Sequence, residues 1–558
     1  MIRPIIYQVF TRLYGANGKH NKSDGTKKQN GCGKMNDFTS EDLSAIKELG
    51  CNYIWYTGLI EHAQKTDYSK YGITPDNPEV VKGRAGSPYA IKDYYDIDPD
   101  LAEDVPERLH EFDALVRRTH EAGLRMIIDF VPNHVARQYH SDAKPIGIND
   151  LGEDDNNTTR FDPHNNFYYL VGEQLSLQNV IDNQDSVSYR ENPAKVTGND
   201  CFSAYPSRND WYETVKLNYG VDYEHDRHTY FNAVDVPDTW NKMLDILRYW
   251  SSRGVDGFRC DMAEMVPCEF WGWVIPKIKS EHKDIIFIAE VYNPWEYRNY
   301  IFNGKFDYLY DKVGLYDTLR AVVGGDSASR ITQCWQSVDD IQEHMLNFLE
   351  NHDEQRIASE FFAGSAQKGC PALLVSALMR NNPFMIYFGQ ELGEEGMNEE
   401  GFSGRDGRTT IFDYWTIDKI KRYRNNQLSD SEKSLREFYN KVLSLCNDEP
   451  AIREGKFFDL MYANYQNPLM DTNHEYAFLR HTDGQLIIVI ANFEDKSVDM
   501  GLNIPRHAFD YLSIAPGIYD SVEMLTGEKG RTHLEPDGLI NLILPPLSGL
   551  VIKVAINH

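Results

Sequence analysis

The sequence predicts an α/β protein: a (β/α)8 TIM barrel with an inserted domain B after its third strand and a C-terminal antiparallel β domain. As far as Pro450 the chain repeats one pattern, in which an amphipathic helix ends at a glycine and a short apolar strand follows. Acidic residues stand directly after several of these strands. Repeated helix–strand units imply a parallel sheet, and eight such strands close most naturally as a barrel.

The glycines and the strands justify the repeat element by element. Predicted helices end at Gly50, Gly123 and Gly254, where a glycine supplies the left-handed residue that closes the last turn. A strand begins within a few residues of each glycine. The eight predicted strands are 5–10, 53–56, 125–131, 255–261, 285–290, 306–310, 345–349 and 384–388.

Two long departures from the repeat predict further domains. About a hundred residues rich in Asn, Asp, Tyr and Gly separate His134 from a helix near Asp238, whereas a βα connection usually has about 2 to 6 residues. After Pro450 the pattern changes to alternating strands and turns. The predicted boundaries are 1–134 and 236–454 for the two parts of the barrel, 135–235 for the insert and 455–558 for a C-terminal β-sandwich domain.

Composition narrows the choice of partner. The chain has 85 Asp and Glu against 57 Lys and Arg, so 57 − 85 gives a net charge of −28. That charge repels phosphate backbones and anionic lipid, which excludes nucleic acid as a partner and favours a neutral substrate. No stretch reaches the roughly 20 apolar residues that a membrane span needs. We therefore expect a protein with no membrane partner.

The first residues and the cysteines bear on localisation. Met1–Phe10 lacks the long hydrophobic run and the small-residue cleavage site of a secretory signal peptide. Its pattern instead predicts the first strand. The eight cysteines are scattered, with no CxxC pair, which is typical of free thiols in a reducing compartment. The sequence therefore predicts a cytoplasmic protein.

Three acids at strand ends predict the chemistry. Asp261 and Glu290 each end a predicted strand, and the carboxyl ends of barrel strands surround one cavity. Cleavage of a glycosidic bond with retention needs two carboxyl groups about 5 to 5.5 Å apart, one as nucleophile and one as proton donor. We assign Asp261 as nucleophile, Glu290 as acid/base and Asp353 as an electrostatic stabiliser of the transition state.

Neighbouring polar and aromatic residues fit the same interpretation. Arg259 lies two residues before Asp261, so both side chains point to one face of the strand and the guanidinium would keep the carboxylate ionised. His134 and His352 could donate hydrogen bonds to a sugar. Tyr89 offers a flat ring for stacking against one.

Several motifs together resemble a known family. The acidic segments are Asp129-Phe-Val-Pro-Asn-His134, Gly257-Phe-Arg-Cys-Asp261, Ile288-Ala-Glu290 and Phe348-Leu-Glu-Asn-His-Asp353, and further short motifs are Ser87–Tyr94, Val215–Tyr219 and Ile386–Glu391. They resemble the α-amylase family, the glycoside hydrolase family 13 of retaining α-glucosidic enzymes. The resemblance covers nearly the whole chain. It implies the three roles given above and places Arg259, Asp129, His134 and His352 at supporting positions for substrate binding.

The chain departs from true α-amylases at two places. These enzymes commonly have Lys-His three and four residues after the nucleophile, where this chain has Glu264 and Met265. The second strand ends Thr57-Gly58 instead of Thr-Pro. The first difference brings the chain nearer to the neopullulanase, cyclomaltodextrinase and maltogenic amylase branch.

Metal binding stays open from sequence. Asn133 matches a residue that binds a structural Ca²⁺ ion in many relatives and braces a loop in others, so the two interpretations weigh equally. Asp96, Asp98 and Asp100 alternate as in a calcium loop, but the loop's glycine and final glutamate are missing, which favours a solvated turn. No catalytic cofactor is implied.

The leading hypothesis is a retaining hydrolase that cleaves α-1,4-glucosidic bonds in maltodextrins, starch fragments or related oligosaccharides. An α-glucan transglycosylase would use the same glycosyl-aspartate intermediate and pass it to a sugar. A sugar-binding relative without activity is the alternative from another class, and such proteins usually lack one or more of the acids that this chain keeps. A lone acid at a strand end is most often a cap, but the whole set in register favours catalysis.

Overall fold

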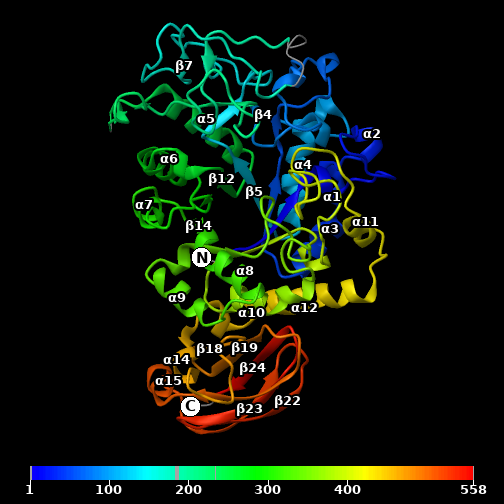
Figure 1. Ribbon diagram of the computed structural model, residues 1–558, viewed down its shortest axis with the longest axis vertical. Coiled ribbons are helices and arrows are strands. Elements are labelled where there is room, and N and C mark those ends of the chain that lie inside the picture. The colour runs from blue at the N-terminus through cyan, green and yellow to red at the C-terminus, as the bar shows by residue number, and fades with distance from the viewer. Residues whose placement is uncertain (1–2, 182–187, 233, 557–558) are drawn as a thin grey trace.

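The computed structural model describes residues 3–181, 188–232 and 234–556 (Figure 1). Eight parallel strands form a closed barrel in the order β1-β16-β15-β14-β13-β12-β5-β2. Their bounds are β1 (Ile5–Phe10), β2 (Tyr53–Thr57), β5 (Arg125–Phe130), β12 (Gly257–Cys260), β13 (Ile286–Ala289), β14 (Tyr308–Tyr310), β15 (Met345–Phe348) and β16 (Phe384–Tyr387). Each strand predicted for the barrel is present, which confirms the predicted fold class.

Helices surround the barrel. The longer ones are α3 (Ser40–Glu48), α4 (Arg108–Glu121), α5 (Asp238–Ser252), α6 (Cys268–Glu281), α9 (Arg330–Ser337), α10 (Cys370–Leu378) and α12 (Asp430–Asp448). Shorter ones are α1 (Thr11–Tyr14), α2 (Lys27–Asn30), α7 (Tyr297–Phe302), α8 (Asp317–Val323) and α11 (Asp418–Arg424). Gly50, Gly123 and Gly254 have φ of +110°, +73° and +92° after α3, α4 and α5, as the stop signals predict.

The segment between β5 and α5 forms a layer above the barrel (Figure 1). Its short antiparallel pairs are β6 (His134–Ala136) with β9 (Thr214–Lys216), β7 (Tyr169–Leu170) with β8 (Ala194–Lys195), and β10 (Val221–Asp222) with β11 (His228–Thr229). A separate apolar cluster that includes Tyr168, Leu170 and Val196 fills this layer. The hairpin of β3 (Ile60–His62) and β4 (Ile91–Ile97) follows β2. Because β5 and β2 both lead into this side, the insert covers the carboxyl ends of the strands.

The C-terminal domain lies at the opposite end of the molecule (Figure 1). One sheet has the order β17-β18-β19-β24-β21-β22, and a second pairs β20 with β23. The strands are β17 (Lys456–Asp459), β18 (Glu475–Thr482), β19 (Gln485–Asn492), β20 (Val498–Ile504), β21 (Gly517–Glu523), β22 (Lys529–Leu534), β23 (Gly538–Leu544) and β24 (Ser548–Ala555), with helices α13 (Pro450–Arg453), α14 (Met461–Asn464) and α15 (Arg506–Leu512). Helix α10 packs on β19 and β24 and so joins this domain to the barrel.

The aspartates 96, 98 and 100 do not form the solvated turn that we expected. These three residues are 0%, 1% and 2% exposed, respectively. Asp96 pairs with Arg108 of α4, and His62 Nδ1 lies 2.9 Å from Asp98 Oδ2. The sequence prediction was wrong because the side chains that pair with these acids lie on other elements and cannot be read from the local spacing.

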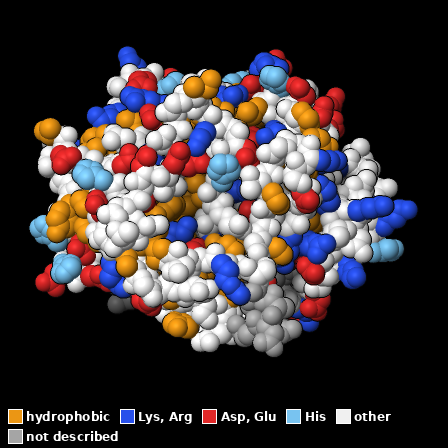
Figure 2. All heavy atoms as spheres, turned by 90° about the horizontal axis from the view of Figure 1, so that it is seen from above, with side chains coloured by type: hydrophobic (Ala, Val, Ile, Leu, Met, Phe, Trp, Pro, Cys, Tyr) orange, Lys and Arg blue, Asp and Glu red, His pale blue; other side chains and the backbone are white. Residues whose placement is uncertain are grey.

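The face drawn in Figure 2 carries charged side chains of both signs. On the face drawn in Figure 2, acidic and basic side chains are interspersed over the described residues, and no continuous basic patch is visible there. Among the helices of the described residues, none combines the length and the apolar character required to cross a bilayer.

Candidate active site

The three predicted acids meet at one cavity. Asp261 follows β12, Glu290 follows β13, and Asp353 lies beyond the end of β15. All three line a cavity of about 370 Å³ at the carboxyl ends of the strands, together with Tyr89 and His134. A parallel barrel brings these positions together because its strands end at one rim. The spatial convergence that the sequence predicted is therefore present.

Arg259 contacts two of the acids, Asp261 and Glu290, from beneath the cavity. It lies on β12, and its side chain is completely buried. Its Nη1 donates to Asp261 Oδ1 at 2.6 Å, and its Nη2 lies 2.8 Å from Glu290 Oε2. Burial and the charges of neighbouring carboxylates raise the pKa of Asp261, and the Arg259 guanidinium opposes them. The net pKa of Asp261 therefore lies well above its ordinary value, and the buried cation is the neighbour that favours its carboxylate form.

Glu290 has donors on both of its oxygens. The backbone N–H of Met262 donates to Oε2 at 2.8 Å, and the hydroxyl of Tyr292 donates to Oε1 at 2.6 Å. Met262 has a φ of +44°, a left-handed conformation that a non-glycine residue rarely adopts. This turn directly after Asp261 aims the Met262 N–H at the neighbouring acid, so the backbone is shaped for the site.

Asp353 stands at the more open side of the cavity. Its side chain is 35% exposed, and its Oδ2 lies 3.1 Å from His352 Nε2. Burial, followed by the charge of Glu290, raises the pKa of Asp353 to about 7. Like-charged carboxylates that share a cavity resist simultaneous ionisation, which gives the site a group that titrates near neutrality.

The two histidines are held as neutral donors. Asn133 uses its Oδ1 to accept from Lys216 Nζ, so its amide nitrogen faces His134 Nδ1, 3.1 Å away. His134 therefore carries its proton on Nε2. Burial, then the charges of Lys216 and Lys82, lowers the pKa of His134 to about 3.

His352 is fixed in the same way. Gln8 Nε2 lies 2.9 Å from its Nδ1, which leaves the proton on Nε2, towards Asp353 and the Tyr89 hydroxyl. Burial and the charge of Arg259 lower the pKa of His352 well below its usual range. His352 is 1% exposed and lies behind the cavity wall.

Tyr89 forms part of the wall itself. Its hydroxyl lies 2.5 Å from His352 Nε2, and its ring centroid lies 5.4 Å from the Arg259 guanidinium carbon. These contacts fix the ring on one side and leave it lining the cavity. The predicted position for stacking against a sugar is therefore at the site.

Asp129 lies deeper than the other predicted residues. Its Oδ2 accepts from Trp55 Nε1 at 3.1 Å and from the backbone N–H of Gly58 at 3.4 Å. Its Oδ1 lies 3.6 Å from Arg259 Nη1. Burial raises the pKa of Asp129 to about 6 against the opposing charge of Arg259. These contacts place Asp129 beneath Arg259, where it supports the guanidinium.

The surroundings of Asn133 do not fit a Ca²⁺ ion. The ammonium group of Lys216 lies 2.9 Å from Asn133 Oδ1 and 2.6 Å from Asp200 Oδ1, and the Lys216 side chain is 2% exposed. A cation of the chain itself thus lies between these two oxygens. Of the two interpretations that the sequence left open, the geometry favours the brace.

The cavity wall also contains residues outside the predicted set. Trp211 of the insert reaches the cavity, whereas Tyr219 is packed in the core. Tyr292 was missed, although its spacing of two from Glu290 puts both side chains on one face of an extended segment. Phe402 and Phe412, from the long segment after β16, carry no sequence signal of a site.

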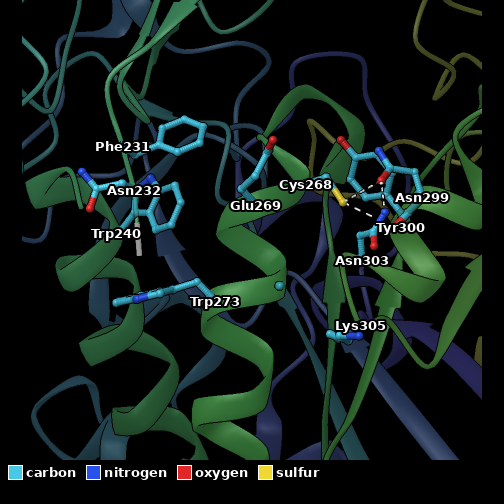
Figure 3. Close-up of a pocket in the computed structure, with 11 residues that line it drawn as sticks. Phe231, Asn232, Trp240, Cys268, Glu269, Trp273, Asn299, Tyr300, Asn303 and Lys305 are labelled. Carbon is cyan, nitrogen blue, oxygen red and sulfur yellow. Dashed lines mark hydrogen bonds between the residues drawn. The ribbon is translucent and has the colours of Figure 1, made fainter. Parts of the chain in front are cut away.

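A larger cavity, of about 780 Å³, lies outside the barrel between the starts of α5, α6 and the helix α7. Figure 3 shows Trp240 and Trp273 on one side of it and Asn299 and Asn303 on the other. Glu269 is the one acid among its described lining residues. Because paired carboxylates are needed for glycosidic chemistry, the smaller cavity is the candidate active site.

Comparison with known proteins agrees with this geometry. The family model described as alpha amylase, catalytic domain, matches residues 16–449. The chain belongs to the alpha-amylase family. This match spans most of the barrel and the insert, and it contains all of the cavity residues discussed above.

Individual relatives of the alpha-amylase family are distant. "Alpha-amylase 2" of Dictyoglomus thermophilum is 22% identical over 89% of this chain and 71% of its own. The cyclomaltodextrinase of Thermoanaerobacter pseudethanolicus is also 22% identical, with the same two coverages. A solved alpha-amylase from Geobacillus thermoleovorans, complexed with acarbose, superposes with a TM-score of 0.63 at 17% identity and covers 100% of this chain and 99% of its own. The family is thus established, and its relatives differ in activity.

Proposed function

We propose that the protein is a retaining hydrolase of α-1,4-glucosidic bonds in maltodextrins, starch fragments or related oligosaccharides. The observation that carries the proposal is the convergence of Asp261, Glu290 and Asp353 on one cavity, with Arg259 in contact with the first two. Membership of a family that acts on α-glucans supports the substrate class. The acarbose complex of a structural neighbour supports a glucan-like ligand.

The first step of the proposed reaction forms a glycosyl-enzyme ester. Asp261 attacks the anomeric carbon, and the bond from that carbon to the leaving oxygen breaks as Glu290 gives its proton to that oxygen. Arg259 occupies Oδ1 of Asp261, so we assign the attack to Oδ2. Positive charge develops on the sugar ring in the transition state, where the carboxylate of Asp353 stabilises it.

The second step releases the sugar. Glu290, now a carboxylate, takes a proton from water, and the water oxygen attacks the anomeric carbon and displaces Asp261. The two inversions together retain the α configuration. Neutral His134 and the ring of Tyr89 hold the sugar through a hydrogen bond and stacking. Both steps use side chains of this chain alone, so the proposal requires no catalytic cofactor.

Transfer to a second sugar is the other candidate. It begins with the same ester and differs only in the acceptor. The apolar residues Phe402, Ile411 and Phe412 in the cavity wall favour a sugar acceptor because they bind its C–H faces and order little water. The ratio of longer to shorter products would separate transfer from hydrolysis.

Product analysis tests the proposal. The protein is incubated with maltoheptaose, pullulan, cyclodextrin and sucrose, and the products are followed by NMR from the first minutes. We expect α-configured reducing ends from an α-1,4-linked substrate. Early release of the β anomer would refute retention, and sugar binding without any turnover would favour the non-catalytic alternative.

The state of the cysteines supports the proposed cytoplasmic location. All eight, from Cys32 to Cys446, are free. Free buried thiols are typical of a reducing compartment. Fractionation of cells, with the protein traced by an antibody, would test this location.

A further inference from the structure

We propose that Tyr292 and Glu264 act as positioning residues for the proton donor Glu290: Tyr292 through its hydroxyl, and Glu264 by fixing the backbone of Tyr292. The inference rests on the proposed function, because it assigns a role within the protonation of the leaving group. It concerns two residues outside the set of catalytic acids. Glu264 also stands at one of the two positions where the chain departs from true α-amylases.

Tyr292 contacts the proton donor directly. Its hydroxyl donates to Glu290 Oε1 at 2.6 Å, a short distance for a hydrogen bond to a carboxylate. Tyr292 also lines the active-site cavity, so the contact lies where a leaving group would depart. Burial, followed by the charge of Glu290, raises the pKa of Tyr292 well above its ordinary value, which keeps the phenol protonated.

The hydroxyl differs in kind from the other groups that face Glu290. The Met262 N–H and the Arg259 guanidinium, both at Oε2, can only donate. A phenol oxygen can donate to the carboxylate and can also accept from the carboxylic acid. Tyr292 is therefore the partner that stays hydrogen-bonded when Glu290 gains or loses its proton. The proton is thereby directed to Oε1.

Glu264 fixes the segment that carries this hydroxyl. Its Oε2 accepts from the backbone N–H groups of Tyr292 and Asn293, both at 3.1 Å. Glu264 lies in the short 3-10 turn Ala263–Met265, three residues after Asp261. One carboxylate thus ties the loop after β12 to the loop after β13.

A second contact holds the same turn. Tyr300 of α7 donates from its hydroxyl to the carbonyl oxygens of Glu264 at 3.1 Å and Val266 at 2.9 Å. The turn that carries Glu264 is therefore anchored on the helix that follows β13. Because its own backbone is fixed, Glu264 can hold the backbone of Tyr292 where the Tyr292 hydroxyl reaches Glu290.

The test compares two substrates on the same enzyme. Maltotriose has an alcohol leaving group that needs the proton of Glu290, whereas 4-nitrophenyl α-maltoside has a leaving group that departs with little help. Tyr292→Phe should lower kcat/KM for maltotriose about 10- to 100-fold and for the nitrophenyl substrate less than about threefold. The ratio of the two values does not depend on the fraction of correctly folded enzyme.

The Glu264 variants separate a specific contact from general damage. Glu264→Ala removes the acceptor of two N–H groups and should change the substrate ratio in the same direction as Tyr292→Phe. Glu264→Gln keeps an oxygen at that place and should restore most of the wild-type ratio. Glu269→Ala, at an exposed position at the start of α6, is the matched control and should leave both substrates unaffected.

Each outcome decides the inference. An unchanged ratio in Tyr292→Phe, or equal losses on both substrates, would overturn the role of the hydroxyl. A Glu264→Gln enzyme as impaired as Glu264→Ala would overturn the proposed role of Glu264. Failure of the proposed function looks different: the wild-type enzyme itself would then turn over neither substrate.

Discussion

The guanidinium of Arg259 lies 2.6 Å from Asp261 Oδ1 and is completely buried beneath the active-site cavity. Its other terminal nitrogen lies 2.8 Å from Glu290 Oε2, and Asp129 supports it from below. One planar cation thus holds the nucleophile and the proton donor in a fixed relation. A fork of this kind has a geometry that a lysine ammonium cannot reproduce.

Arg259→Lys should therefore lower kcat on maltotriose about 100-fold or more, because one acid loses its partner and a buried charge is left uncompensated. Steady-state kinetics would measure the loss. Arg253→Lys is a matched control, since Arg253 pairs with Asp113 at the partly exposed surface and should change little. A variant that keeps a tenth or more of the wild-type kcat would contradict this role of Arg259.

Asp353 should make stability fall as pH rises. Its pKa of about 7 in the folded protein exceeds the value of about 4 in an unfolded chain. Between these pH values only the folded state holds the proton, so the stabilising contribution is complete below about pH 4 and is lost as pH rises through 7. Asp353→Asn should lose this dependence.

Urea unfolding at pH 5 and pH 8 would measure the effect. We expect Asp353→Asn to gain stability relative to the wild type at pH 8 and to gain less at pH 5, while activity is lost. Such a gain is typical of a residue kept for function at the expense of stability. An equal difference at both pH values would show that Asp353 does not titrate between them.

We expect the ammonium group of Lys216 to serve beside Asn133 in place of a metal ion. Lys216→Met removes the ammonium group between Asn133 and Asp200 and should lower the free energy of unfolding by about 2 kcal/mol. The loss is smaller than for a fully buried pair because the Asp200 side chain is partly exposed. Lys433→Met, on the exposed face of α12, is the control and should change little. Chemical denaturation would give both values.

A second variant makes the same point with Ca²⁺. Lys216→Asp would place a third oxygen ligand beside Asn133 and Asp200. Added Ca²⁺ should then raise the melting temperature of this variant by several degrees, which corresponds to roughly 1 kcal/mol or more of binding free energy. The wild type should show no such increase from this site. An equal increase in both proteins would mean that Ca²⁺ acts elsewhere and would remove the argument for Lys216.

Tyr89 should act mainly through its ring. Tyr89→Ala removes the stacking surface and should lower kcat/KM for maltotriose about 100-fold, whereas Tyr89→Phe keeps the ring and should lower it less than about tenfold. The Phe variant loses only the hydrogen bond to His352. If both variants lose equally, the hydroxyl and not the stacking surface carries the effect.

The sequence alone determined the barrel and the position of the acids along it. Apolar strands after each helix-ending glycine are local signals, and they placed all eight barrel strands. A parallel barrel then leaves little freedom: residues at strand ends must meet at one rim. For that reason Asp261, Glu290 and Asp353 could be assigned together from their positions.

Contacts between distant elements were decided by the tertiary structure. The spacing of Asp96, Asp98 and Asp100 predicted a solvated turn, but cations from elsewhere in the chain made it a buried one. Likewise, nothing near Asn133 in sequence revealed that Lys216 supplies its cation. Charges pair through space, so the sequence that specifies each partner does not specify the pairing.

The same distinction applies within the active site. The sequence determined which residues could act as nucleophile and acid, because their types and strand positions suffice for that assignment. Only the folded chain decided that Met262 and Tyr292 hold Glu290 and that Glu264 spans two loops to fix Tyr292. Hydrogen bonds depend on distances of tenths of an ångström between loops, and no pattern of residue types carries that information.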